Sequence, residues 1–494
     1  MSSLGDEGVL LHGAVRILRG EKLYQDFFGI LPPGGYLIIT AWMKLFGLEF
    51  ASARALAIGV IAAIAALVYL AARLASDSRR FAATIAVAWV VLSPGTLTVI
   101  NHHWLTTAAS MASAVCLLLV VEGVSPRGAA FAAGFFGGVA AMVTSTRGAL
   151  LCTTVLAVLL TGPASRRVGL RAVAGMALFP TGMFLYVVAN ATLVAAVEGV
   201  VRYPLVHYPS VQLVPFGEGA SPQHWVAIAF FPATFALAGL ALVLDRFAPW
   251  RDPRFRVTLA LAAVGFIGSY PRPDHVHLAF TLPLACPLFA LAGRSLPFSG
   301  RIALGTVFGG LGLLGLVGAI SSVVTVSRSP AVPTSRGLIV ADSDLPARDV
   351  ANLMLQLDRI PSGSGFFYPY SPLLAYLTGR RHVAPVDVML PGYTSAGQFH
   401  QACLQVAAEA EYVVIDRQWT SAFIRRVFPA IRDPDPPEKQ HLESALRDTF
   451  DRIYISTRFE LRQRSPHAAG GICGPADRSP FAASGYSPSP SASR

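Results

Sequence analysis

Charged residues are scarce in this chain. They make up 14% of its 494 residues, whereas apolar residues make up 53% and the mean hydropathy is +0.54. This composition excludes an ordinary soluble globular protein, because several apolar runs are long enough to cross a hydrocarbon core of about 30 Å. We therefore expect a polytopic α-helical membrane protein that contacts membrane lipids.

Lysine is almost absent, since only three of the 39 basic residues are lysines. The net charge of +11 does not indicate nucleic-acid binding, because the arginines fall in short clusters between apolar segments. That distribution is typical of the positive-inside rule, by which basic clusters remain on the cytoplasmic side of the membrane. We expect no nucleic-acid partner.

Cysteine is rare as well, with five residues in the whole chain. Cys116, Cys152 and Cys286 lie in apolar segments, where a thiol behaves as a small hydrophobic group. Cys403 and Cys473 are the pair that could meet outside the bilayer. Because Cys473 falls in a predicted tail, we expect no disulfide.

The apolar segments predict about ten membrane helices. They lie near residues 54–73, 81–98, 105–122, 129–145, 148–162, 171–190, 224–244, 257–270, 276–292 and 302–325. If the first loop is extracytoplasmic, almost every arginine cluster between these segments falls inside. Residues 34–47 are too short to span and begin beside prolines, so we expect a helix at the membrane interface there. The turns at 101–104, 147 and 270–277 and a long loop at 191–222 then face outward.

The composition divides the chain into four parts. Residues 1–50 form a first outer loop with juxtamembrane helices, residues 51–326 the transmembrane bundle, residues 327–465 a small extracytoplasmic α/β domain, and residues 466–494 a disordered tail. The α/β prediction rests on a helix-like stretch at 346–360 and a β-rich run at 412–415. The tail is rich in Ser, Pro, Gly and Ala and has too little apolar content to order itself.

An acidic pair, Asp6 and Glu7, stands at the start of an amphipathic segment. Leu10, Leu11, Ala14, Ile17 and Leu18 follow at helical spacing, so the acids would lie in the first turn of a helix. Acids stabilise that end of a helix dipole, which is a purely structural explanation. The alternative is a catalytic carboxylate at the membrane edge, where ionisable groups are candidates for function.

The first hundred residues resemble the GT-C-fold glycosyltransferases, which include the protein O-mannosyltransferases and the lipid A aminoarabinose transferases. The matching stretches are Gly5-Asp6-Glu7-Gly8, the block from Arg16 to Phe27 that contains Asp26, Pro32-Pro33-Gly34, Lys44 to Gly47, and Arg54. The remaining helices are similar to this family in general layout.

The resemblance implies a GT-C-like bundle in the cytoplasmic membrane that moves a sugar from a polyprenyl-phosphate donor. Transfer would occur on the outer face, with inversion, to a lipid, glycan or protein acceptor. Asp6, with Glu7, would be the catalytic acid pair, and Asp26 a secondary substrate-binding candidate. Some relatives use a divalent cation, but the sequence has no closely spaced carboxylate set for one, so we assign no metal ligand.

Members of that family have a membrane helix ahead of the acidic loop, whereas Met1 to Gly5 alone precede Asp6 here. Either the natural start lies upstream or this is a truncated, non-catalytic homologue. A transporter or flippase of a lipid-linked or hydrophilic solute is the other alternative. That class predicts ionisable groups near mid-membrane, whereas here they gather at the predicted outer ends.

Two outer turns carry candidates for binding. His102 and His103 could contact donor or acceptor, or could anchor the helix at the headgroup level together with Trp104. Arg147 is an exception to the positive-inside rule, because it falls in a turn that is predicted to face outward. Its side chain could snorkel to lipid headgroups. It could also bind the donor phosphate, because a guanidinium offers a fork of N–H donors and stays charged.

The outer turn from Pro271 to His277 holds four ionisable groups, Arg272, Asp274, His275 and His277, between stiffening prolines. One interpretation is a mutual Arg272–Asp274 ion pair with exposed histidines. The functional interpretation is that Arg272 or His275 neutralises the departing polyprenyl phosphate while Asp274 orients it.

Overall fold

The computed structural model describes residues 5–92, 99–161, 166–218, 224–340, 346–361, 363–466 and 473. The chain divides into two compact units. The helical unit comprises Ala55–Leu185 and Val214–Thr325, and the mixed unit comprises Met1–Arg54, Tyr186–Leu213 and Val326–Arg494. The prediction of a disordered tail at 466–494 concerns residues that, apart from Pro466 and Cys473, lie outside the described part of the chain.

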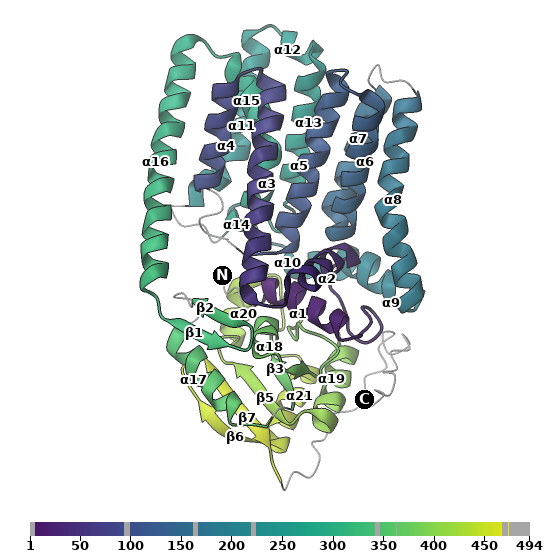
Figure 1. The fold of residues 1–494 in the computed structure, drawn as a ribbon, viewed down its shortest axis with the longest axis vertical. Helices are drawn as coiled ribbons and strands as arrows, with labels where there is room; N and C mark the ends of the chain where they lie inside the picture. Colours follow the sequence, from purple (N-terminus) through teal and green to yellow (C-terminus); the bar gives the residue numbers. More distant parts are fainter. Residues whose placement is uncertain are drawn as a thin grey trace. The chain divides into compact units, whose positions relative to one another are not determined.

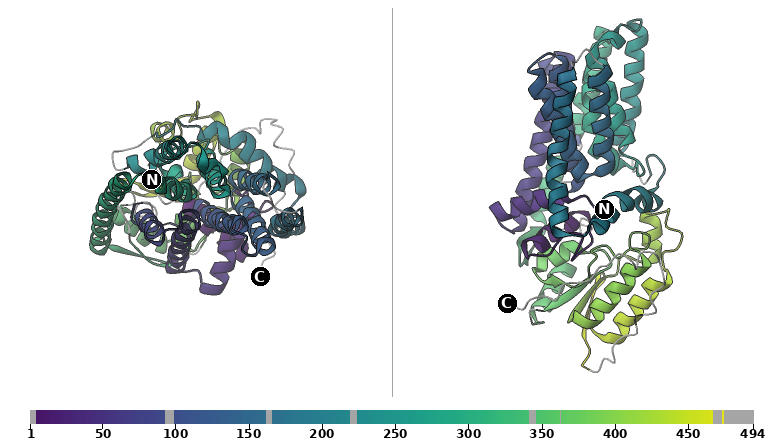
Figure 2. Two further views of the ribbon diagram at one scale, coloured as in Figure 1. Left: turned by 90° about the horizontal axis from the view of Figure 1, so that it is seen from above. Right: turned by 90° about the vertical axis from the view of Figure 1, so that its right-hand side faces the viewer.

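The helical unit is built from long apolar helices that run alongside one another (Figure 2). Its elements are α3 (Phe50–Ser76), α4 (Arg79–Leu92), α5 (His102–Val121), α6 (Pro126–Val143), α7 (Ser145–Thr161), α8 (Arg166–Asn190), α11 (Trp225–Leu244), α12 (Ala248–Arg251), α13 (Pro253–Ile267), α14 (His275–Thr281), η4 (Leu282–Ala285), α15 (Cys286–Arg294) and α16 (Phe298–Arg328) (Figure 1).

Each of the ten predicted spans falls on a helix or on a continuous helical run, although residues 93–98 of the second span and residue 162 of the fifth lie outside the described part. Among the described residues, seven helical stretches are long and apolar enough to cross a membrane, with α14, η4 and α15 counted as one stretch. The chain is therefore a multi-pass membrane protein. The described parts of α4 and α13 have 14 and 15 residues and α7 has 17, so the full number of ten spans stays a prediction.

Glycines let helices of this unit approach closely. A Cβ on Gly134 of α6 would lie 2.0 Å from the carbonyl oxygen of Ala172 in α8, and a Cβ on Gly175 would lie 2.0 Å from that of Phe131. Small residues at such crossings allow backbone contact, which supplies van der Waals packing where lipid offers no hydrophobic driving force.

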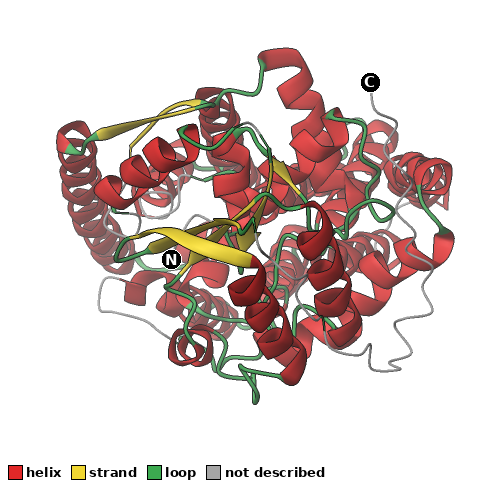
Figure 3. Ribbon diagram, turned by 90° about the horizontal axis from the view of Figure 1, so that it is seen from below, coloured by secondary structure: helices red, strands yellow, loops and turns green. Residues whose placement is uncertain are grey.

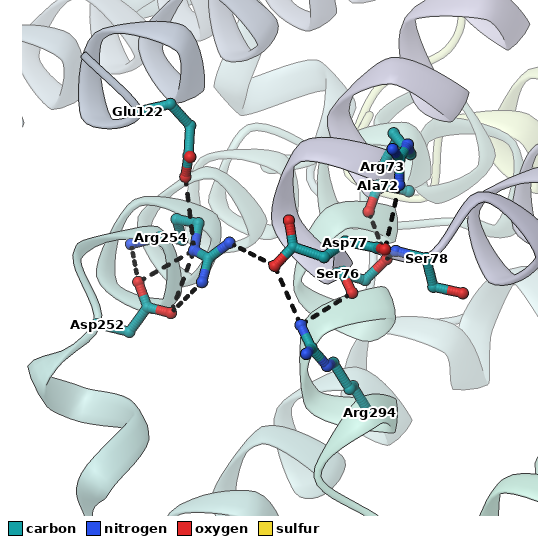
Figure 4. A network of polar contacts seen from close by, with 9 residues as sticks. All are labelled: Ala72, Arg73, Ser76, Asp77, Ser78, Glu122, Asp252, Arg254 and Arg294. Carbon is teal, nitrogen blue, oxygen red and sulfur yellow. Dashed lines mark hydrogen bonds and ion pairs between the residues drawn. The ribbon is translucent and has the colours of Figure 1, made fainter.

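A polar network joins turns at one end of the helical unit (Figure 4). Asp77, in the turn after α3, accepts from Arg254 of α13 at 2.8 Å and from Arg294 of α15 at 3.1 Å. Arg254 also lies 3.6 Å from Glu122, at the end of α5. The arginine pattern predicts that these turns share one side of the membrane, and the contacts between them agree with that prediction.

The mixed unit combines N-terminal helices with a sheet from the C-terminal region. Its elements are α1 (Asp6–Leu18), α2 (Pro33–Phe46), α9 (Leu193–Val197), η2 (Glu198–His207), α10 (Tyr208–Gln212), β1 (Ala331–Thr334), β2 (Gly337–Val340), α17 (Ala347–Asp358), β3 (Ser364–Tyr368), α18 (Pro372–Thr378), β4 (Arg381–His382), α19 (Ala396–Glu409), β5 (Tyr412–Asp416), α20 (Ser421–Val427), α21 (Pro437–Thr449), β6 (Phe450–Ile455) and β7 (Phe459–Arg464).

The main sheet has the strand order β4-β3-β5-β7-β6. Figure 3 shows strands in yellow with helices in red beside them. Strand β3 pairs in parallel with β4 and β5, and β7 pairs antiparallel with β5 and β6. Phe366 and Val413 are register partners and share a buried core with Phe399, Val406 and Leu446 of the covering helices. The predicted α/β region is thus a mixed sheet with helices packed on it.

Two sequence expectations need correction. The segment 191–222 is expected to be a loop, but Leu193–Gln212 is helical, with a wide π-type stretch from Glu198 to His207. The expected absence of a disulfide is also wrong, because Cys403 of α19 is bonded to Cys473. The apolar content of a segment predicts whether it packs, but it carries no information about a single covalent cross-link.

Candidate functional site

The Asp6 carboxylate stands exposed at the first position of α1, as the acidic pair predicts. Its Oδ1 accepts a hydrogen bond of 2.5 Å from the hydroxyl of Tyr370, which follows β3. Desolvation and the neighbouring Asp6 carboxylate raise the pKa of Tyr370 well above its usual value, so the phenol remains a donor. Sequence alone does not single out Tyr370, because 364 residues separate it from Asp6.

Glycines on α1 make this contact possible. A Cβ on Gly8 would lie 2.1 Å from the backbone nitrogen of Leu373 in α18, and a Cβ on Gly5 would lie 2.3 Å from the Tyr370 ring. Any larger side chain at these positions would push α1 away from α18. The glycines flanking the acidic pair therefore fix where the Asp6 carboxylate lies.

Glu7, the other predicted catalytic acid, is fully buried. Arg54 donates to both of its carboxylate oxygens, at 2.5 and 2.8 Å. The guanidinium also lies over the Phe50 ring, 4.3 Å from its centroid. A bidentate pair of this kind holds α1 on the first residues of α3, up to Arg54, which belong to the mixed unit. Glu7 is therefore placed to anchor the helix that carries Asp6.

Asp26 is half-buried and closes its own turn, since its carboxylate accepts from the backbone nitrogen of Lys22 at 2.7 Å. This local bond gives Asp26 a structural explanation. Its predicted contact with substrate stays a prediction.

A buried polar cluster lies farther along α1, and Arg16 is its one member that belongs to a stretch carrying the sequence resemblance. Asp387 accepts from His12 Nδ1 at 3.0 Å and lies 3.6 Å from Arg16 and 3.8 Å from His382. Burial works against the charged form of Asp387, but His12 and Arg16 hold the pKa of this carboxyl below its usual range. Burial lowers the pKa of His382 to about 3, so this imidazole is uncharged at neutral pH.

In the helical unit, the turn before α14 forms a compact ion cluster. Arg272 Nε donates to Asp274 Oδ2 at 2.7 Å, and His277 Nδ1 lies 2.7 Å from Asp274 Oδ1. Asp274 also caps α14 by accepting from the backbone nitrogens of Val276 and His277. The expected Arg272–Asp274 ion pair is therefore present, and both residues are buried. The histidines expected to be exposed beside it, His275 and His277, are instead half-buried, because His277 pairs with Asp274 and His275 stacks on His224.

The three motifs that the sequence places at outer turns of this unit come together. Thr106 of α5 and Thr144 before α7 share a hydrogen bond of 2.7 Å. Arg147 is buried and donates from Nε to the carbonyl of Gly268 at 2.7 Å. The His103 ring lies 4.9 Å from that of His277, edge to face.

The histidines of this cluster lie against other aromatic rings. The centroids of His102 and His103 are 3.8 Å apart with their planes tilted by 40°, and His103 stacks on Phe280 at 4.6 Å. His275 stacks on His224 at 3.8 Å with an interplanar angle of 13°. Within the described part of the chain, the Nδ1 atoms of His102, His103 and His275 are buried without a hydrogen-bond partner.

No group of three or more His, Cys, Asp or Glu side chains is placed to hold a metal ion among the residues that the structure describes. The histidines and Asp274 instead use their contacts for stacking, ion pairing and helix capping.

No protein-family model matches the chain, and no curated protein matches its sequence. Solved structures do match its fold, which is that of the GT-C membrane glycosyltransferases, as the sequence resemblance predicts. The structure of ArnT from Cupriavidus metallidurans bound to undecaprenyl phosphate aligns with a TM-score of 0.56 and 13% identity, over 95% of both chains. ArnT in the apo state aligns with a TM-score of 0.56 and 12% identity, over 92% of this chain and 93% of ArnT.

A cryo-EM structure of the arabinofuranosyltransferase AftD from Mycobacteria aligns less well, with a TM-score of 0.44 and 16% identity. That alignment covers 89% of this chain and 35% of AftD. The similarity to ArnT, at its level of identity, establishes the fold alone.

Proposed function

We propose that this protein is a glycosyltransferase that moves a sugar from a polyprenyl-phosphate donor to an acceptor hydroxyl on the outer face of the cytoplasmic membrane. The observation that carries the proposal is the likeness in fold, over 95% of both chains, to an ArnT structure that holds undecaprenyl phosphate. The exposed carboxylate of Asp6 and the buried arginines of the helical unit supply side chains suited to this reaction.

In the proposed reaction, Asp6 takes the proton of the acceptor hydroxyl. The acceptor oxygen forms a bond to the anomeric carbon, and the bond from that carbon to the phosphate oxygen breaks, with its electron pair leaving on the phosphate. Attack and departure on opposite faces invert the anomeric centre. The Tyr370 hydroxyl holds Asp6 Oδ1, which leaves Oδ2 to receive the proton.

Arg147 and Arg272 are the proposed phosphate-binding residues, with His275 as a further donor. A guanidinium offers five N–H donors, and the Nε bonds to Gly268 and Asp274 fix the orientation of the two side chains. Fixed cations stabilise the charge that grows on a leaving phosphate. His102, His103 and Asp274 would shape this site through the stacking and ion-pair contacts described above.

Glu7 has a different proposed role from Asp6. Both of its oxygens already accept from Arg54, so Glu7 would position α1 and would not exchange a proton with substrate.

Two features support an extracytoplasmic mixed unit. The Cys403–Cys473 disulfide is typical of oxidising compartments, and the arginine pattern leaves this part of the chain on the outer side.

The orientation is tested with single cysteines introduced at exposed positions, Asp451→Cys in β6 and Arg246→Cys in the turn after α11. In sealed right-side-out membrane vesicles, an impermeant thiol reagent should label the first and not the second. The reverse pattern contradicts the orientation.

The function is tested with purified protein, polyprenyl phosphates carrying radiolabelled mannose, glucose or arabinose, and membranes as the acceptor source. Asp6→Asn should lower transfer by about a hundredfold or more, the usual contribution of a positioned base. Asp451→Asn, which changes an exposed carboxylate on β6, is the matched control. Transfer by Asp6→Asn at the wild-type rate would remove Asp6 from the mechanism.

A further inference from the structure

The carboxyl ends of β3 and β5 form an edge at which the connections of the sheet change direction. Strand β3 is paired in parallel with β4 on one side and with β5 on the other. The chain leaves β3 through α18 to reach β4 and then returns through α19 to β5. In open α/β sheets, ligands bind outside the carboxyl ends of the strands at such a switch point.

Aromatic side chains occupy the two loops at this edge. Tyr370 follows β3 and Trp419 follows β5, and their ring centroids lie 5.4 Å apart in an edge-on arrangement. Both side chains are half-buried. The Trp419 ring also contacts Phe423, with the ring centroids 5.1 Å apart, and this contact holds it in place.

A buried ion pair fixes both loops. Arg458 donates to the two oxygens of Asp416 at 2.9 and 3.0 Å, and Asp416 is 1% exposed. Asp416 also accepts from the Ser371 hydroxyl at 3.4 Å and from the backbone nitrogen of Gln418 at 3.1 Å. One carboxylate therefore connects the loop of Tyr370 to the loop of Trp419.

A hydrogen-bond acceptor lies beside these rings. The Asp6 carboxylate is bonded to Tyr370 through Oδ1 and is exposed. A ligand at this edge would meet aromatic rings and a carboxylate that accepts hydrogen bonds from hydroxyl groups.

We propose that this edge binds the acceptor and that the acceptor is a glycan, with one sugar ring on Trp419 and a hydroxyl at Asp6. The proposal rests on the proposed function and names the acceptor class. A sugar ring offers C–H groups to an aromatic ring and a hydroxyl donor to the exposed carboxylate of Asp6. An acyl chain has no donor for this carboxylate and would displace the water around it, at a cost in binding free energy.

The test measures binding of the full-length protein in detergent to immobilised arabinan, mannan, rhamnan and lipopolysaccharide-core oligosaccharides. An octanoyl surface and an oligoalanine surface serve as the lipid and polypeptide probes. Trp419→Ala should weaken glycan binding by about tenfold, equivalent to about 1.4 kcal/mol for the loss of one aromatic contact. Tyr454→Ala, at a half-exposed tyrosine of the edge strand β6, should bind like the wild type.

Trp419→Phe keeps an aromatic ring and should retain most of the affinity for glycan. This variant serves as the control for misfolding of Trp419→Ala. Wild-type protein that binds none of the glycans, or that binds the octanoyl or oligoalanine surface instead, overturns the proposal. Equal glycan binding by Trp419→Ala and wild type overturns it as well. The binding assay contains no donor, so a failure of sugar transfer does not change its outcome.

Discussion

Arg54 donates two parallel hydrogen bonds to the carboxylate of Glu7, a residue with no exposed surface. This pair attaches the first turn of α1 to the start of α3. It therefore controls the position of Asp6, the next residue toward the N-terminus. The pair also separates the roles of two adjacent acids that sequence alone does not distinguish.

Replacing Arg54 by Met should destabilise the protein by about 3 kcal/mol, because it leaves the Glu7 carboxylate buried without its partner. Arg54→Lys keeps the positive charge but loses the pair of parallel N–H donors. The stability of this variant should therefore lie between that of Arg54→Met and that of the wild type. The double variant Glu7→Gln with Arg54→Met should recover part of the loss. Thermal unfolding in detergent provides the measurement, and equal melting temperatures for all four proteins would contradict a stabilising pair.

Gly8→Ala should displace α1 from α18. The new Cβ would meet the backbone nitrogen of Leu373 at 2.1 Å, and backbone cannot yield as a flexible side chain can. Overpacking of this kind costs about 1–3 kcal/mol, and sugar transfer should fall with it because Asp6 moves. Gly397→Ala in α19 is the control, since nothing lies within 4 Å of a Cβ there. A Gly8→Ala protein as stable and as active as the control would show that the close approach is unnecessary.

Much of the local structure is predictable from short-range pattern. The acidic pair and the apolar spacing after it predict α1, which begins at Asp6, and the β-rich run at 412–415 predicts β5. The helix at 193–212 is not predicted, because Pro204 and Pro209 are typical of turns and loops. Contacts such as Tyr370 with Asp6 join segments far apart in the chain, and no periodicity in one sequence encodes them.

The same limit applies to the turns of the helical unit that are predicted to face outward. Their charges predict the Arg272–Asp274 pair because the two residues are two positions apart. The hydrogen bond from Arg147 to Gly268 and the ring contact between His103 and His277 depend on how the helices pack. Sequence places each motif at a helix end but does not indicate which motifs meet.

The stability of the mixed unit should fall as the pH drops from about 6.5 toward 4. Burial lowers the pKa of His382 to about 3. The charge of Asp387 works in the opposite direction and raises this pKa, whereas His12 and Arg16 lower it further. Below the unfolded pKa of about 6.5, the unfolded chain takes up a proton that the folded chain does not, so stability declines by up to about 1.4 kcal/mol per pH unit.

His382→Asn removes this titration and keeps an acceptor for the backbone nitrogen of Phe367, which donates to His382 Nδ1 at 3.3 Å. Its denaturant midpoint should depend less on pH between 6.5 and 4 than that of the wild type. His441→Asn, at an exposed position of α21, should keep the wild-type slope. Identical pH slopes for His382→Asn and wild type would rule out a contribution from His382.

Arg272→Gln should lower kcat and raise the KM for the polyprenyl-phosphate donor, because the proposed phosphate site loses a cation. Loss of one donor to a developing oxyanion costs roughly a hundredfold in kcat. Arg272→Lys keeps the charge without the fork and should recover part of kcat, provided that Asp274 continues to cap α14 through the nitrogens of Val276 and His277.

Arg246→Gln is the matched control for this variant, because Arg246 is exposed in the turn after α11. A structural role for Arg272 alone predicts lower stability with an unchanged KM for donor in the folded fraction. A phosphate-binding role predicts a raised KM for donor in the folded fraction, in addition to any loss of stability from the buried Asp274. The Lys variant preserves the charge and should therefore lower this raised KM. Kinetics at varied donor concentration, with melting temperatures of the same preparations, therefore decide whether Arg272 binds phosphate or only orders its own turn.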